Sequence, residues 1–139
     1  MKSLIVLAML VFPGQATTAP VAGTWTAQFE GKTFATLKLE STAGRLTGGL
    51  TIGDAEFDTK GALKRVGEPP RELKPIFDVK QSGSVVAFSR RDVDDIDRFE
   101  FRILTDNRAE LRLLLSDDDL KELAAEGVPP PGPIQFTKR

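Results

Sequence analysis

Hydrophobic and polar residues alternate along most of the chain from about residue 24 onward, which is the period of a half-buried β-strand. The clearest case is 98–103, where Phe99, Phe101 and Ile103 alternate with charged residues. Segments of this kind are short and separated by turn residues, and they cover 24–30, 33–40, 46–52, 55–63, 76–80, 85–89, 98–103, 109–115 and 134–138. This pattern predicts an all-β domain of eight or nine strands at hairpin spacing.

One helix is expected, over residues 117–126, late in the chain. Ser116 is a typical N-cap residue, with an aspartate three positions later, and Gly127 provides the stop before a run of prolines. Within the helix, Leu120 and Leu123 are the apolar pair that we expect to be buried.

The string of strands favours an up-and-down antiparallel barrel of about eight strands, since closure removes exposed sheet edges. A two-sheet β-sandwich is the alternative. Gly48 and Gly49 lie within one expected strand and predict a bulge or a sharp bend there. The interior would be rich in phenylalanine, and the side chains expected to line any apolar cavity are Phe29, Leu50, Phe77, Phe88, Phe99 and Phe101.

The first sixteen residues have the pattern of a signal peptide. A lysine at position 2 precedes an apolar run over 4–12, which is too short to span a bilayer, and Gly14-Gln15-Ala16 offers small residues at a cleavage site. We expect cleavage after Ala16, leaving residues 17–139 as a single barrel domain that is secreted or periplasmic, without membrane insertion.

Composition bears mainly on chemistry. The chain of 139 residues has no cysteine, histidine or tyrosine, and its formal net charge is −1. Because histidine is the usual general base near neutral pH and the commonest metal ligand, we expect no catalysis, no metal and no cofactor. The balanced charge gives no reason to expect a nucleic-acid partner.

Two groups of aspartates are candidate cation sites. Asp92, Asp94, Asp95 and Asp97 lack the turn glycine of a calcium loop, and arginines flank them. We interpret 92–97 as an acidic hairpin loop. The three aspartates at 117–119 stand at the start of the expected helix, where negative charge is favourable.

Several short motifs give the chain a family resemblance. Gly23-Thr24-Trp25, which contains the only tryptophan, opens the first strand, and Gln28, Thr33-Phe34, Leu46-Thr47-Gly48 and Phe136-Thr137-Lys138 follow in order. This series resembles the calycin barrels, the lipocalins and avidins, and it also resembles small exported bacterial barrels of unassigned role. The resemblance implies a barrel closed between its first and last strands.

The avidin ligand positions are not retained. Ala27 stands where an avidin has the asparagine that binds the biotin ureido group, and Leu50 where it has a binding tyrosine. We therefore expect the fold without biotin binding. Alternation along the last strand places Lys138 or Arg139 over the ring of Trp25, which we expect to close one end of the barrel.

The function expected from these observations is that of an exported, non-catalytic binding module. It would hold an apolar small molecule in the barrel, or bind a protein through its loops as a protease inhibitor does. The alternative is a hydrolase that uses paired carboxylates.

Overall fold

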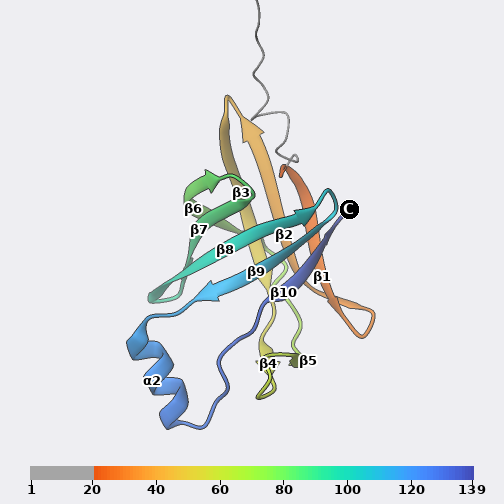
Figure 1. The fold of residues 1–139 in the computed structure, drawn as a ribbon. Coiled ribbons are helices and arrows are strands. Elements are labelled where there is room, and N and C mark those ends of the chain that lie inside the picture. The colour runs from red at the N-terminus through yellow and green to blue at the C-terminus, as the bar shows by residue number, and fades with distance from the viewer. Residues whose placement is uncertain (1–20) are drawn as a thin grey trace, which may run out of the picture.

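The computed structural model describes residues 21–139, so the expected signal peptide lies outside the described residues. Eight antiparallel strands form a closed barrel in the order β1-β10-β9-β8-β7-β6-β3-β2 (Figure 1). Their bounds are β1 Gly23–Phe29, β2 Lys32–Thr42, β3 Arg45–Ile52, β6 Lys74–Ser82, β7 Val85–Asp92, β8 Asp95–Thr105, β9 Arg108–Leu114 and β10 Ile134–Lys138. The expected all-β barrel with one short helix is confirmed.

The region expected to be a single strand over 55–63 forms a separate hairpin instead. β4 (Ala55–Phe57) and β5 (Leu63–Val66) pair with each other and with no barrel strand. Asp58 holds the connection between them, because its carboxylate accepts hydrogen bonds from the backbone N–H groups of Lys60 and Ala62 at 2.8 and 3.0 Å. The β4–β5 hairpin therefore projects from the barrel between β3 and β6.

The helix α2 (Asp117–Ala125) has the expected N-terminal cap. Ser116 Oγ accepts a hydrogen bond from the Asp119 N–H at 3.1 Å, and the Asp119 carboxylate accepts one from the Ser116 N–H at 3.3 Å. The expected burial of its leucines is wrong: no residue of α2 is buried, and Leu120 is 42% exposed. In Figure 1 the helix stands beside the barrel, at the end where β4 and β5 lie, and it does not pack over the sheet.

Two other local expectations are corrected. The pairing of β2 with β3 runs without a shift through Gly48 and Gly49, so there is no bulge between these strands. A Cβ at Gly48 would collide with the Lys38 carbonyl oxygen, so glycine is required there by the close approach of β2. The aspartates at 92–97 are not a loop either: only Val93 and Asp94 form the turn, and the others continue β7 and β8.

The barrel core is densely filled at the end that holds Trp25. The Trp25 ring is fully buried and meets Phe101 edge to face at 5.2 Å between centroids, and Phe101 meets Phe136 in the same way at 5.6 Å. Trp25 Nε1 donates a hydrogen bond to the Val21 carbonyl at 2.9 Å, so the segment before β1 closes over the ring. This end of the barrel is therefore filled by its own aromatic side chains.

Candidate functional site

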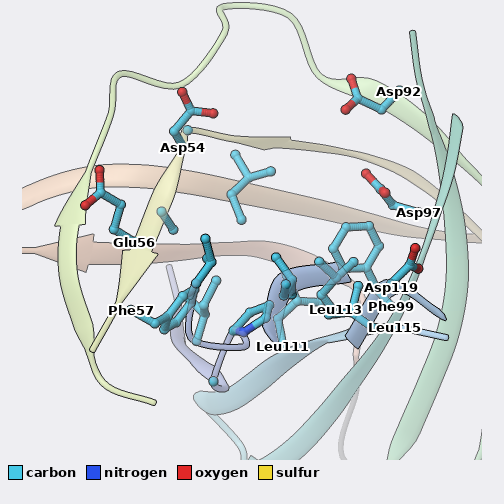
Figure 2. A pocket seen from close by; sticks show the side chains of 18 of the residues that line it. Asp54, Glu56, Phe57, Asp92, Asp97, Phe99, Leu111, Leu113, Leu115 and Asp119 are labelled. Carbon is cyan, nitrogen blue, oxygen red and sulfur yellow. The ribbon is translucent and has the colours of Figure 1, made fainter. Parts of the chain in front are cut away.

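The opposite end of the barrel contains a large open hollow, which we call the cup. Its volume is about 1230 Å³. Strands of the barrel contribute apolar side chains to it, while the β4–β5 hairpin and α2 supply outer walls (Figure 2). The apolar lining comprises Leu50, Ile52, Phe57, Phe99, Leu111, Leu113, Leu115, Leu123, Val128 and Ile134. The barrel is thus closed at one end and hollow at the other.

Backbone contacts fix the outer walls of the cup. Thr51 Oγ1 donates a hydrogen bond to the Pro70 carbonyl at 2.7 Å, which holds the segment after β5 against β3. Gly61, at the hairpin tip, and Gly132, in the proline-rich segment before β10, approach so closely that a Cβ at Gly132 would collide with the Gly61 carbonyl oxygen. The hairpin and this segment therefore meet and enclose one side of the cup.

The cup is strongly acidic around its apolar lining. Nine carboxylate side chains line it against three basic ones, Lys64, Lys74 and Arg90. We call the nine the acidic lining, and they are Asp54, Glu56, Asp58, Glu72, Asp92, Asp95, Asp97, Asp119 and Glu122. Figure 2 shows Asp54 and Glu56 on the opposite side of the cup from Asp92 and Asp97, with Leu111, Leu113 and Leu115 lower in the view.

One charged pair lies inside the barrel wall itself. Arg90 and Asp97 face each other in the pairing of β7 with β8, and Arg90 Nη2 lies 3.6 Å from Asp97 Oδ2. The Arg90 guanidinium also lies over the Phe99 ring, 5.7 Å from its centre, and Phe99 stacks on Phe88 at 5.3 Å. The pair therefore belongs to the layer of the core that borders the cup.

Burial is the largest influence on the pKa of Asp97 in this pair. Desolvation raises the pKa of Asp97 above the ordinary value of 3.8, and the neighbouring Asp92 adds to the increase, while Arg90 opposes it. Arg90 is only 9% exposed, and its Nε atom is buried without a hydrogen-bond partner. A buried guanidinium that leaves a donor unused is energetically costly, so this residue is a candidate for contact with a ligand.

The six side chains expected to line a cavity fall in different places. Leu50 and Phe99 line the cup. Phe88 is buried behind Phe99, Phe101 is buried against Trp25, and Phe29 is only partly buried at the edge of the core.

The expectation that Phe77 points into the barrel is wrong. β6 contains a bulge between Phe77 and Lys80, with Asp78 at a φ of 51°, and Ile76 takes the inward position opposite Arg90. Phe77 instead lines a second, outer hollow of about 500 Å³ together with Lys74, Pro75, Ile76, Arg91 and Val93. The bulge moves this side chain out of the alternation that the sequence suggests.

Arg90 and Asp97 were missed as interior residues, although the sequence contains the signal. Val86 and Phe88 alternate inward along β7, and Arg90 is the next position of the same series. Asp97 likewise precedes Phe99 and Phe101 on the inner face of β8. Charged residues are rarely buried unless paired, so the sequence alone favours a solvated loop over 92–97 with arginines at its flanks.

Among residues 21–139, no group of three or more side chains is arranged to hold a metal ion. The same residues include no helix with the length and apolarity needed to cross a bilayer. Comparisons with protein-family models, with curated proteins and with solved structures found no match to this chain.

Proposed function

We propose that this protein is an exported, non-catalytic binding module that holds a small, largely apolar molecule in the cup. The observation that carries the proposal is the cup itself, a hollow of about 1230 Å³ with an apolar lining continuous with the barrel core. Ligand sites are typically concave, mostly apolar and provided with a few polar groups, and eight-stranded barrels of the lipocalin and streptavidin type hold one small ligand.

The calycin resemblance is part of the same proposal. Closure between the first and last strands, through the pairing of Trp25 with Lys138, is what that resemblance implies for the architecture. Biotin is not the proposed ligand. Ala27 is buried without a polar group to offer, and Leu50 lends only an apolar surface to the cup.

Hydrolysis by paired carboxylates is the competing function, and Asp97 is the observation in its favour, since its pKa is raised within a hollow. A general acid of this type is normally matched by a second carboxylate that acts as base or nucleophile. Asp92 and Asp95 lie close enough to influence the ionisation of Asp97. Its direct partner, however, is Arg90, which stabilises the charged carboxylate and does not share a proton with it. We therefore favour binding over catalysis.

The proposal is tested with a neutral apolar fluorophore, N-phenyl-1-naphthylamine. We expect its emission to rise on binding to the wild-type protein, and the Leu113→Trp variant, which places a bulky ring in the cup, to reduce the rise. The matched control is Leu104→Trp, at a position that is 49% exposed and does not line the cup. Equal binding by both variants, or none by the wild type, would refute the proposal, and turnover in a hydrolase screen that is lost in Asp97→Asn would favour the alternative.

A further inference from the structure

The most informative polar group in the cup is Arg90. Its side chain is 11% exposed, and the residue is among those that line the cup. Nε has no hydrogen-bond partner, and the contact with Asp97, at 3.6 Å, is longer than an ordinary hydrogen bond. A guanidinium carries five N–H donors in a fixed plane, and here they are incompletely used.

An unused donor beside an apolar cavity specifies a hydrogen-bond acceptor on the ligand. Nε is covered by protein atoms, so the guanidinium would have to rotate to present an N–H to such an acceptor. The apolar part of the ligand would then lie against Phe99 and Leu111, which border the same hollow. This arrangement places a polar head group at Arg90 and an apolar body along the cup.

The acidic lining decides the charge of that head group. A carboxylate at Arg90 would lie near Asp97, with Asp92 and Asp95 close enough to Asp97 to influence its ionisation, and it would enter a cup with nine carboxylates against three basic groups. An ammonium group would suit the acidic lining, but it has no acceptor for Arg90 and is repelled by its charge. An uncharged acceptor avoids both conflicts.

We propose, on the basis of the binding function above, that the cup selects amphiphiles with an uncharged carbonyl head group, such as an amide, and that Arg90 donates the hydrogen bond that recognises it. The selection combines an attractive contact at Arg90 with repulsion of carboxylates by the acidic lining. The specificity of the site therefore depends on one buried cation and its acidic surroundings.

Three probes with the same ten-carbon chain test the proposal: decanamide, decanoate and decylamine, each titrated at neutral pH to displace N-phenyl-1-naphthylamine. We expect decanamide to bind at least about tenfold more tightly than either charged probe. Equal displacement by all three, or tightest binding of decanoate or decylamine, would overturn the inference and leave the proposed function standing. Absence of fluorophore binding would instead refute the proposed function.

Two variants assign the preference to Arg90. Arg90→Lys keeps the positive charge and loses the planar donor set, so the advantage of decanamide should fall about tenfold. Arg91→Lys is the matched control, because the neighbouring Arg91 lines the outer hollow and not the cup. An unchanged preference in Arg90→Lys, with the variant folded as judged by its denaturation midpoint, would contradict the role of Arg90. The comparison of the three probes on the wild-type protein is independent of either variant.

Discussion

Lys138 Nζ lies 5.5 Å from the centre of the Trp25 ring, and the two residues face each other in the pairing of β10 with β1. The contact joins the first and last strands of the barrel at its closed end. It occupies the position that alternation along the last strand predicts, since Ile134, Phe136 and Lys138 share the inner face of β10.

Trp25→Ala should therefore be among the most damaging single substitutions. The ring is fully buried, so its loss leaves a large cavity and should lower the free energy of unfolding by roughly 3–5 kcal/mol. Lys138→Met, which keeps much of the side-chain stem, should cost about 0.5–2 kcal/mol through loss of the cation–π contact. Urea denaturation measures both, and a Trp25→Ala midpoint equal to that of the wild type would show that the ring is not part of the core.

Val93 offers a stabilising substitution. It is 82% exposed at the turn between β7 and β8 and has a φ of 43°, a left-handed conformation that is costly for a β-branched residue. Val93→Asn should raise the free energy of unfolding by up to about 1 kcal/mol, because asparagine tolerates this conformation far better.

The control for Val93→Asn is Gly83→Val, which introduces a β-branched residue at a position with positive φ. Gly83 lies in the turn between β6 and β7 with a φ of 62°, and a Cβ there would meet no atom within 4 Å. Gly83→Val should therefore destabilise through backbone conformation alone, by about 1–2 kcal/mol. Thermal or urea unfolding that ranks the two variants in the reverse order would contradict this explanation.

Gly132→Ala tests the contact that encloses the cup. The new methyl group would collide with the Gly61 carbonyl and force the β4–β5 hairpin away from the segment before β10. Because neither segment belongs to the barrel sheet, we expect fluorophore binding to weaken about tenfold while the barrel keeps nearly its full stability. Gly44→Ala, in the distant β2–β3 turn with a φ of 78°, should do the reverse and lower stability without affecting binding.

The raised pKa of Asp97 leads us to expect a specific dependence of stability on pH. Its pKa is higher in the folded protein than the ordinary 3.8, so the folded state favours the protonated carboxyl. The contribution of Asp97 to stability is thus fully present below the unfolded pKa and is lost as pH rises through the folded pKa. As pH rises from the unfolded to the folded pKa of Asp97, the wild type should lose stability relative to Asp97→Asn. Above the folded pKa, the difference in unfolding free energy between the two proteins should stay constant. A shift in favour of the wild type would mean that the ion pair with Arg90 outweighs desolvation.

The sequence predicts the barrel well because its strands carry local information. Alternation along β8 and β10, the turn residues between strands and the Ser116 cap each follow from neighbouring residues, and the structure confirms these elements. Features that depend on residues far apart in the chain, or on backbone geometry, could not be predicted in the same way. The bulge that turns Phe77 outward depends on the backbone at Asp78, and the close approach of Gly61 to Gly132 joins segments far apart in the chain.

The cup could be predicted only in part. Leu50 and Phe99 follow from inward alternation, but the sequence does not indicate that the core fills one end of the barrel and leaves the other hollow. That asymmetry arises from Trp25, Phe101 and Phe136 packing together at one end. The hollow end also depends on α2, whose leucines are not buried in the barrel. The amphipathic spacing of this helix does not by itself predict that arrangement.

The pairing of β3 with β6 closes the barrel through only two residue pairs, Gly49 with Pro75 and Leu50 with Lys74. Pro75 has no N–H to donate, so the hydrogen bonding between β3 and β6 is weaker than two ordinary residue pairs would provide. By contrast, β7 and β8 pair at eight positions. β1 and β10 also pair at only two positions, but neither involves a proline. We therefore expect the β3–β6 junction to open readily, and amide hydrogens of β3 to exchange with solvent sooner than those of β8. Since Leu50 and Lys74 also line the cup, opening of this junction would widen the route by which a molecule enters the interior.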